Sequence, residues 1–373
     1  MSAILEKRRE YRDLDWQTAT LAILIASFGV WQIHNAVPTE GYWSKQIIGI
    51  GIALVAFIAV CLTDYRRIID AAPVFYIGGL VLLLLVLTPL GVQINGQKAW
   101  VRLPLIGQFQ PSEFMKVPTV LMLAKYFGAK KGNVLGFREM LIGGAIWGGP
   151  LLLIMLEPDA GQAITYVPIL AAMFFLSGIK VRYVVLAVVA AAIMVPTAWY
   201  VGVKSGKIKR YQQERILAIT NPDQVDPRGY GYHTIQSTIT VGKGGLVGIE
   251  GETETSQSVL KFLPEPQTDF IFAVAAENTG FIGCVGLLLA YALLLSRMIA
   301  GARQATDRAG MLVIMSVVCA MVFQIFMNVG MALGMLPVIG VPLPLMSAGL
   351  SAILTTFVAI GFVVSVKLRR FVN

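Results

Sequence analysis

Long apolar runs separated by short polar segments recur along the whole chain. Runs close to 20 residues fall near 16–35, 45–63, 73–91, 113–128, 140–156, 162–179, 183–203, 270–296, 309–336 and 345–366. Because about 20 helical residues cross a hydrocarbon core of roughly 30 Å, these runs are suited to spanning a membrane. The pattern predicts an all-α integral membrane protein of about ten transmembrane helices, folded as a single polytopic domain over residues 1–373.

Composition supports this class and sets an orientation. The chain is 56% hydrophobic and only 14% charged, and its net charge is +9. Many basic residues lie on one side of the predicted bundle, in segments such as Arg66–Arg67, 125–138 and Lys367–Arg370. Cytoplasmic loops retain Lys and Arg, so we expect both termini in the cytoplasm. We expect no nucleic-acid partner, because the charge follows membrane topology.

One polar segment is much longer than the others. Residues 204–269 connect the seventh and eighth predicted spans and therefore lie outside the membrane on the extracytoplasmic side. Basic residues such as Arg210 and Arg215 are balanced there by acidic ones, and long loops escape the charge rule. A connection of this length is uncommon unless it is functional. A solvated exterior loop is the alternative.

Charged residues inside a predicted span mark a second feature. Glu113 and Lys116 are three residues apart, on one face of a helix, where they can neutralise each other. Pro111 and Ser112 precede them and predict the start of that helix, with Ser112 as its cap. Charge inside a membrane span usually marks a working site, although a structural ion pair is equally compatible with the pattern.

Two outer turns carry further polar candidates. Lys98 and Arg102 flank Trp100 after an Asn-Gly turn signal, an arrangement suited to lipid phosphate or to simple interfacial anchoring. Asp159 follows Pro158 between two spans, where it can cap the next helix or face the same outer cavity as Arg102.

Residues 262–272 form the most informative segment. Two prolines precede Thr268 and Asp269, and an apolar run then begins. We expect Thr268 to cap this helix and Asp269 to lie in its first turn, at the outer mouth of the bundle. Asp269 is a candidate general base there, although favourable helix-dipole placement is the alternative. Glu277 lies two turns deeper and requires a polar partner.

Together these segments resemble a known family. The motifs occur in the order Asn95-Gly96…Trp100…Arg102, Gln110-Pro111-Ser112-Glu113-Phe114, Pro158-Asp159-Ala160-Gly161, Gly229-Tyr230-Gly231-Tyr232, Leu263-Pro264-Glu265…Thr268-Asp269-Phe270, and Gly340-Val341-Pro342-Leu343-Pro344. The chain is similar over nearly its whole length to the shape, elongation, division and sporulation (SEDS) family of peptidoglycan polymerases. Segments 221–227 and 256–260, and the short tails, are most similar to its RodA branch.

The resemblance implies an inverting glycosyltransferase of the bacterial plasma membrane that polymerises lipid II for cell elongation and rod shape. Asp269 matches the family's essential aspartate, and Arg102, Glu113, Lys116 and Asp159 match polar positions around its outer cavity. Family members are associated with a divalent cation, Mg²⁺ or Mn²⁺. Their partners are a class B penicillin-binding protein, which is the transpeptidase, and other membrane proteins of the elongation complex.

The chain departs from the family pattern at three places. Gln267 stands where a histidine is common, and Asn278 replaces the second acid of a Glu-Glu pair. Residues 347–351 replace a Ser-Tyr-Gly-Gly-Ser-like stretch. Asp269 is retained, so the chemistry implied by the resemblance is untouched.

The mechanism implied is a single displacement. Aspartate has an ordinary pKa of about 3.9 and is ionised at neutral pH, so Asp269 can take a proton from the acceptor's sugar hydroxyl. That oxygen then attacks the donor's anomeric carbon, and lipid diphosphate leaves towards nearby cations. Arg102, Lys116, Arg210, Arg215 or a metal ion are the candidates for this positive charge. Lys98 and Glu277 are candidate structural or supporting residues.

Two other functions stay open from the residues alone. A lipid II flippase or another secondary transporter would place charged groups near the bilayer midplane, as Glu113, Lys116 and Glu277 allow. A non-catalytic scaffold for cell-wall enzymes is the third hypothesis, but a scaffold does not require charges buried in its spans.

Overall fold

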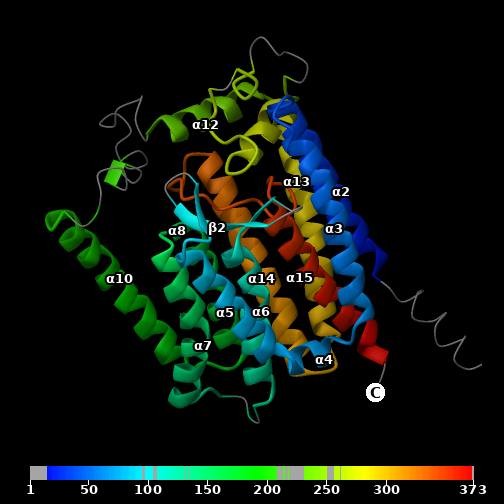
Figure 1. Cartoon of the computed structure of the whole chain (residues 1–373), viewed down its shortest axis with the longest axis vertical. Coiled ribbons are helices and arrows are strands. Elements are labelled where there is room, and N and C mark those ends of the chain that lie inside the picture. The colour runs from blue at the N-terminus through cyan, green and yellow to red at the C-terminus, as the bar shows by residue number, and fades with distance from the viewer. Residues whose placement is uncertain are drawn as a thin grey trace, which may run out of the picture.

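The protein is a bundle of helices with a small sheet near one end (Figure 1). This computed structural model describes residues 15–94, 97–103, 107–130, 132, 134–206, 208, 213–214, 217, 231–249, 256–260 and 262–371. The longer helices are α2 (Trp16–Ala36), α3 (Tyr42–Leu62), α5 (Ala72–Leu87), α6 (Pro111–Gly128), α7 (Phe137–Leu156), α9 (Val167–Leu176), α10 (Val181–Lys204), α12 (Gly231–Lys243), α13 (Ile271–Arg303), α14 (Arg308–Ala332) and α15 (Leu350–Leu368). The short ones are α4 (Tyr65–Asp70), α8 (Ala160–Thr165) and the 3₁₀ turn η2 (Arg369–Phe371).

Every predicted apolar segment coincides with a helix or with two consecutive helices. Within the described residues, seven helices are long and apolar enough to cross a membrane: α2, α3, α7, α10, α13, α14 and α15. The apolar helix α5 and the α8–α9 pair are shorter, and α6 carries the charged pair. The prediction of an integral membrane protein made of helices is therefore confirmed. The count of about ten spans stays a prediction.

The core lies where α15 is enclosed by its neighbours. α15 packs most closely along α3, and α14 packs against α13, α6 and α9. Gly361 of α15 brings its backbone against the carbonyl of Phe57 and the side chain of Val60, because it has no Cβ to hold the helices apart. In contrast, α10 contributes no buried side chain and extends away from the bundle in Figure 1.

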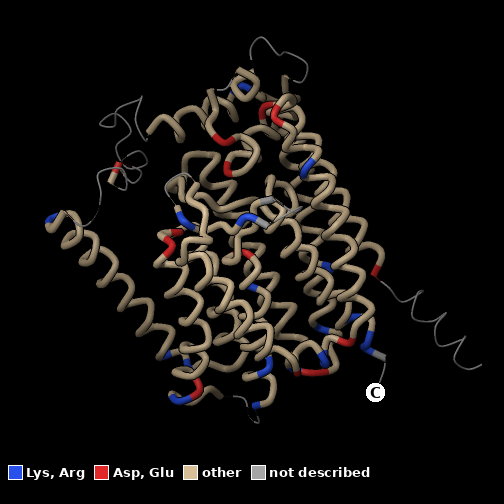
Figure 2. Tube along the Cα trace, viewed as in Figure 1, with Lys and Arg blue, Asp and Glu red and all other residues tan. Residues whose placement is uncertain are grey.

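A three-stranded antiparallel sheet lies between α5 and α6 in the chain. Its strands are β1 (Gly91–Ile94), β2 (Gln97–Leu103) and β3 (Gly107–Phe109), in the order β1-β2-β3. The sequence indicated only a turn, at Asn95–Gly96, which lies outside the described residues. The sheet contacts α5 and α6. Strand β2 and its two cations therefore lie near the end of the bundle that carries the sheet (Figure 2).

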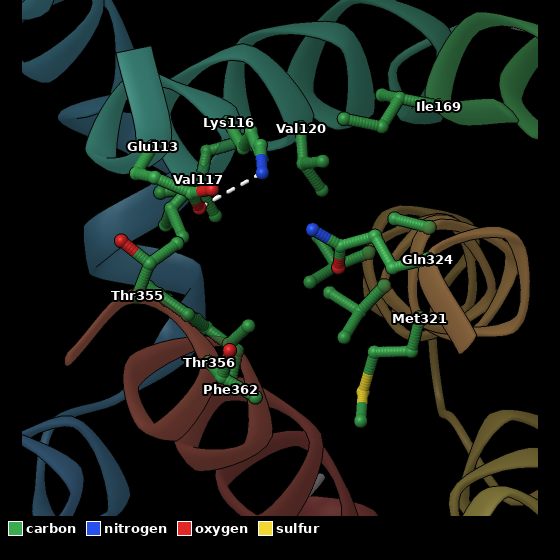
Figure 3. Close-up of a pocket in the computed structure, with 15 residues that line it drawn as sticks. Glu113, Lys116, Val117, Val120, Ile169, Met321, Gln324, Thr355, Thr356 and Phe362 are labelled. Atoms are coloured by element: carbon green, nitrogen blue, oxygen red, sulfur yellow. Dashed lines mark hydrogen bonds and ion pairs between the residues drawn. The ribbon is translucent and has the colours of Figure 1, made fainter. Parts of the chain in front are cut away.

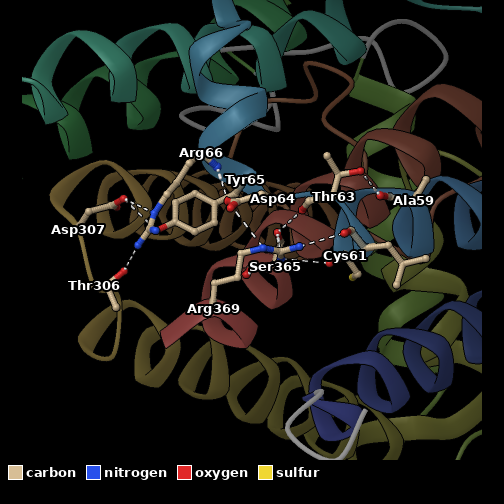
Figure 4. A network of polar contacts seen from close by, with 11 residues as sticks. Ala59, Cys61, Thr63, Asp64, Tyr65, Arg66, Thr306, Asp307, Ser365 and Arg369 are labelled. Atoms are coloured by element: carbon tan, nitrogen blue, oxygen red, sulfur yellow. Dashed lines mark hydrogen bonds and ion pairs between the residues drawn. The ribbon is translucent and has the colours of Figure 1, made fainter. Parts of the chain in front are cut away.

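The two described ends of the chain meet at the opposite end of the bundle. Asp15, which caps α2, pairs with Lys367 of α15 at 2.5 Å and with Arg297 of α13 at 3.1 Å. A second network joins α4, α14 and α15 at this end (Figure 4). In it the Tyr65 hydroxyl donates to Asp307 at 2.9 Å, and Arg369 donates to the Ser365 hydroxyl at 2.7 Å. Both described ends therefore lie on one side, as the orientation argument requires.

The predicted long loop contains helix α12, which packs on α13 and α14. Residues 244–248 then insert where α13 is interrupted at Gly280, whose φ is +64°. There the N–H groups of Phe281 and Ile282 donate to Gly245 and Leu246 at 2.9 and 3.1 Å. The loop carbonyls thus replace partners that the helix itself cannot supply at the kink.

Candidate active site

Asp269 lies in a turn immediately before α13, at the end of the bundle opposite Asp15 and Lys367, and its side chain is half-buried. The turn is held from the segment between α14 and α15. The Ser347 hydroxyl donates to the Thr268 carbonyl at 2.6 Å, and Ala348 N–H donates to the Gln267 carbonyl at 2.8 Å. These bonds fix the backbone on which the candidate base is carried.

The details of this turn correct two predictions. Helix α13 begins at Ile271 with Phe270 in the cap position, so Asp269 precedes the first helical turn. Thr268 does not cap the helix, because Phe270 occupies the cap position and no side-chain hydrogen bond is made there. The Thr268 hydroxyl donates to the Glu265 carbonyl at 3.4 Å. The physical reason is the neighbouring 333–349 segment, whose hydrogen bonds hold residues 266–270 in a separate turn.

Gly340 brings two sequence motifs together. Its φ is +75°, and a Cβ built on it would lie 3.5 Å from one carboxylate oxygen of Asp269. On the other side, Gly161 lies so close to the carbonyls of Ile339 and Gly340 that no Cβ fits at Gly161. The turn containing Asp159 and the turn containing Asp269 therefore contact the same short stretch of backbone.

A buried chain of polar side chains leads from this region into the bundle. Gln110 donates to Asp159 at 2.8 Å, Gln162 donates to Glu113 at 2.5 Å, and Lys116 pairs with Glu113 at 2.8 Å. The predicted pairing of Glu113 with Lys116 is present, and Asp159 also caps α8 by accepting from Gln162 N–H at 3.0 Å. Each acid is thus compensated by hydrogen bonds, as burial in a low-dielectric region requires.

The expected cap of α6 is not formed. Gln110 occupies the cap position without a side-chain hydrogen bond, and the buried Ser112 hydroxyl has no hydrogen-bond partner among the described residues. The Ser112 carbonyl instead accepts from the Tyr166 hydroxyl at 2.8 Å. Tertiary packing against α8 and α9 therefore replaced the local capping that the sequence suggested.

A narrow cavity of about 50 Å³ lies beside the Glu113–Lys116 pair (Figure 3). Lys116 and Gln324 extend into it from opposite walls, and Thr355 approaches from α15. Apart from Thr356, its remaining lining is apolar and includes Val117 and Phe362. A space of this size holds a few water molecules and not a lipid head group.

Glu157, next to Asp159 in the α7–α8 turn, is fully buried, and neither of its carboxyl oxygens has a hydrogen-bond partner among the described residues. Burial, and to a lesser extent the nearby Asp159, raises the pKa of Glu157 to about 8. Burial also raises the pKa of Asp159, although the Gln162 N–H opposes this shift. Glu157 is therefore largely protonated at neutral pH.

The cations predicted near the base lie in different settings. Arg102 is exposed on β2, and Lys98 donates to the Leu87 carbonyl at 3.3 Å. Arg210 and Arg215 lie outside the described residues. The part of these cations in the chemistry stays a prediction.

Glu277 has the polar partner that its position required. Its carboxylate accepts from the N–H groups of Gln257 and Ser258 at 2.5 and 3.3 Å, and from the hydroxyls of Ser256 and Ser258. Asn278, one of the departures from the family pattern, instead donates to Gln32 of α2 at 2.7 Å. Glu277 thus fastens the segment that leads to Asp269 onto α13.

The side-chain amide of Asn328 in α14 donates to the main-chain carbonyls of Asp269 and Val341. Sequence reasoning missed this residue and two others that shape the site, Gln162 and Glu157. Asn328 and Gln162 are isolated amides within or beside apolar runs, and such amides are a signal because a buried amide needs partners. The identity of the partners could not be predicted, since they come from distant elements. Glu157 stands in a turn between two predicted spans, where the sequence gives it no signal of its own.

The chain matches one family profile and several known proteins over nearly its whole length. The family profile described as cell cycle protein, which covers FtsW, RodA and SpoVE, matches residues 14–370. The chain is 34% identical to peptidoglycan glycosyltransferase MrdB of Escherichia coli, covering 94% of this chain and 92% of that protein. It is 32% identical to stage V sporulation protein E of Bacillus subtilis, covering 94% and 93%.

Solved structures show the same fold. One chain from a study of how a peptidoglycan synthase complex coordinates polymerization and crosslinking superposes with a TM-score of 0.81 at 31% identity, covering 96% of this chain and 99% of that chain. The rod shape determining protein RodA of Thermus thermophilus gives a TM-score of 0.71 at 26% identity, covering 96% and 98%. With the family profile matching from residue 14 to residue 370, the chain belongs to the FtsW/RodA/SpoVE family of cell cycle proteins.

Proposed function

We propose that this protein is a peptidoglycan glycosyltransferase that polymerises lipid II into glycan strands for cell elongation. The observation that carries the proposal is the position of Asp269, half-buried at one end of the bundle with its backbone fixed by Asn328 and Ser347. Relatives named peptidoglycan glycosyltransferase, one of which covers 94% of the chain, support the activity.

In the proposed reaction, the Asp269 carboxylate takes the proton of the acceptor's sugar hydroxyl. The electron pair left on that hydroxyl oxygen forms a bond to the donor's anomeric carbon, from the face opposite the diphosphate. The bond between that carbon and the diphosphate oxygen breaks, so the configuration inverts and undecaprenyl diphosphate leaves. General-base assistance of this kind typically contributes about 10²–10⁴-fold to the rate.

The leaving diphosphate requires positive charge. Arg102 is suited to this because it is exposed at the sheet. Lys116 is buried and already paired with Glu113. We propose that this pair orients substrate from the inner side of the site, through the hydrogen bonds that join Glu113 to Gln162 and Gln162 to Asp159. Arg210 and Arg215 of the long extracytoplasmic loop are proposed as additional phosphate contacts.

We also propose that a divalent cation, Mg²⁺ or Mn²⁺, accompanies the bound substrate. The described residues contain no group of three or more Asp, Glu, His or Cys side chains able to hold a metal ion. These residues alone do not fit a dedicated metal site, and Mg²⁺ often takes substrate phosphates as ligands. No step of the mechanism above is routed through the ion.

For localisation, we propose the bacterial plasma membrane with both termini in the cytoplasm. The Asp15–Lys367 pair places both described ends on one side. Basic residues such as Arg66, Lys125 and Arg303 lie on that same side, which favours a cytoplasmic location. Asp269 then faces the extracytoplasmic side, where lipid-linked precursor and growing glycan are found.

We propose that the protein works with a class B penicillin-binding protein that cross-links the strands, and with other membrane proteins of the elongation complex. The support is the similarity to a chain studied for the coordination of polymerization and crosslinking in a peptidoglycan synthase complex. A polymerase that makes linear strands needs such a transpeptidase to produce a network.

A lipid II flippase is the second candidate function. It is favoured by one observation, the buried Glu113–Lys116 pair beside a cavity inside the bundle. Intramembrane charges of this kind are frequent in transporters. The small size of the cavity and the position of Asp269 at the end of the bundle favour polymerisation instead.

The test is polymerisation of lipid II by the purified chain, with and without its transpeptidase partner and with and without a chelator. We expect glycan strands that increase when the partner is added. A parallel assay measures movement of lipid II across vesicles that contain the same protein. Lipid translocation without any glycan, with the partner present, would reject the polymerase and support the transporter.

A further inference from the structure

A hollow of about 470 Å³ lies away from the candidate active site, at the end of the bundle that holds the described termini. It is formed where α5 begins, α6 ends and α7 begins, and its lining includes Pro73, Met122, Lys125, Tyr126 and Lys130. Helix α4, which immediately precedes α5, belongs to the terminal network of Figure 4. The hollow therefore opens at the membrane boundary on that side.

Positive charge dominates this hollow. Lys125 donates to the Asp70 carbonyl at 2.5 Å, and Lys130 donates to the Val134 carbonyl at 2.7 Å. A carbonyl positions an ammonium group without neutralising it, and each lysine has further donors available. Two exposed charges of opposite sign, Arg138 at the start of α7 and Asp70 at the end of α4, lie outside the lining of the hollow.

The described lining contains one acid, Glu139, which lies 3.5 Å from Lys130. Its carboxylate packs so closely on the backbone of Gly136 that no Cβ fits there. Gly136 is the cap residue of α7, so Glu139 lies at a helix N-terminus, where negative charge is favoured. One acid, already engaged there, leaves an excess of cations around the hollow.

Apolar surface adjoins these charges. Pro73, Met122 and the ring of Tyr126 line the hollow. In the same helical turns, Val74 of α5 and Leu141 of α7 are among the exposed large apolar side chains. Cations beside lipid-facing apolar surface match the two parts of a phospholipid, because basic pockets between membrane helices bind anionic head groups.

We propose that this hollow binds the phosphodiester head group of an anionic phospholipid, held by Lys125 and Lys130 with one acyl chain against Met122 and Tyr126. The inference is independent of the proposed glycosyltransferase activity, because none of these residues belongs to the candidate active site. Inorganic phosphate would satisfy the lysines but leave the apolar wall uncovered.

The test is a titration of the purified full chain, in zwitterionic detergent micelles, with phosphatidylglycerol, with phosphatidylcholine and with inorganic phosphate. The apparent dissociation constant is read from the rise in melting temperature. We expect saturable stabilisation by phosphatidylglycerol only. An equal response to phosphatidylcholine, or an equal response to inorganic phosphate alone, would overturn the proposal.

The variant that probes the site is Lys125→Gln with Lys130→Gln, and its matched control is Lys180→Gln with Arg303→Gln. The control removes two exposed cations at the same end of the bundle but outside the hollow. We expect the affinity for phosphatidylglycerol to fall about fivefold for each lysine lost, and to be retained in the control. Unchanged affinity in a folded Lys125/Lys130 variant would overturn the site.

A second variant keeps the test decisive if the double substitution does not fold. Glu139→Gln removes the one acid of the described lining while leaving both lysines in place. We expect it to bind phosphatidylglycerol more tightly than the unmodified protein. Weaker or unchanged binding would contradict the electrostatic basis of the site.

Discussion

The side-chain amide of Asn328 donates hydrogen bonds to the main-chain carbonyls of Asp269 and Val341, at 2.9 and 2.8 Å. Asn328 is fully buried in α14, and its two N–H groups join the turn before α13 to the segment between α14 and α15. The candidate base is therefore positioned by a residue that does not contact its carboxylate.

Replacement of Asn328 should misplace Asp269 without removing it. In Asn328→Leu two buried carbonyls lose their donors, at a cost of about 1–3 kcal/mol for each unsatisfied group, and Asn328→Asp also sets a negative charge against them. We expect polymerisation to slow at least tenfold in both variants, while lipid II binding is retained. The measurement is the initial rate of glycan synthesis together with the affinity for lipid II.

The control for this prediction is Ser316→Ala on the same helix. The Ser316 hydroxyl is buried and has no hydrogen-bond partner in the part of the chain that is described. Its removal should leave the rate close to that of the unmodified protein. A normal rate in a folded Asn328→Leu protein would show that this amide does not position the base.

Any side chain at position 340 should lower the rate of polymerisation. Its φ of +75° is unfavourable for other residues, and an L-residue there costs roughly 1–2 kcal/mol. Its new methyl group would also contact the Asp269 carboxylate. We expect Gly340→Ala to lower the rate several-fold, whereas Gly206→Ala, with a φ of +70° and nothing within 4 Å, should not. Equal rates in the two variants would show that only strain matters.

Glu277 should be needed to hold the segment that leads to Asp269. Glu277→Gln replaces a carboxylate that accepts from residues 256–258 with an amide that presents N–H groups to the same donors. Hydrogen bonds to charged groups contribute about 1.5–3 kcal/mol, so we expect faster proteolysis within 256–268 and slower polymerisation. Normal protease resistance would contradict this role.

Glu157 gives a pH dependence of stability with a defined sign. Its pKa of about 8 lies above the ordinary 4.5, so the folded protein keeps a proton that the unfolded chain releases. Stability should therefore fall as pH rises from about 4.5 to about 8. Glu157→Gln should flatten this profile and stabilise the protein at pH 8.

The gain from Glu157→Gln at pH 8 should be of the order of 2 kcal/mol. This is less than the roughly 5 kcal/mol that about 1.4 kcal/mol per unit gives for the whole pKa shift, because the site relaxes. Melting temperatures of both proteins at pH 5 and pH 8 provide the measurement. Equal differences at both pH values would mean that Glu157 is ionised throughout.

Much of the bundle could be predicted because the length of each apolar run was sufficient to predict a helix. The sheet was missed although β2 carries a signal: Lys98, Trp100 and Arg102 alternate with Ala99 and Val101, the period of a strand. The run of membrane helices around it favoured an interfacial loop. The segment forms a strand because β2 pairs with both β1 and β3.

The site was predicted residue by residue but not as an assembly. Local spacing was sufficient for the Glu113–Lys116 pair and for Asp159 as a helix cap. Contacts between distant segments, such as Asn328 with Asp269 or Gly161 with Gly340, depend on how helices pack and leave no local pattern. The same holds for the insertion of residues 244–248 at Gly280, which depends on how the long loop packs on α13.

The most direct test of the central claim replaces the Asp269 carboxylate by its neutral isostere. Purified Asp269→Asn protein, with its transpeptidase partner, is assayed for lipid II binding and for glycan synthesis, beside Glu40→Gln, which removes an exposed acid at the same end of the bundle. We predict normal binding with synthesis reduced at least about 100-fold in the first protein, and normal synthesis in the second. Glycan synthesis by the Asp269→Asn protein at the unmodified rate would contradict the assignment of this carboxylate as the base.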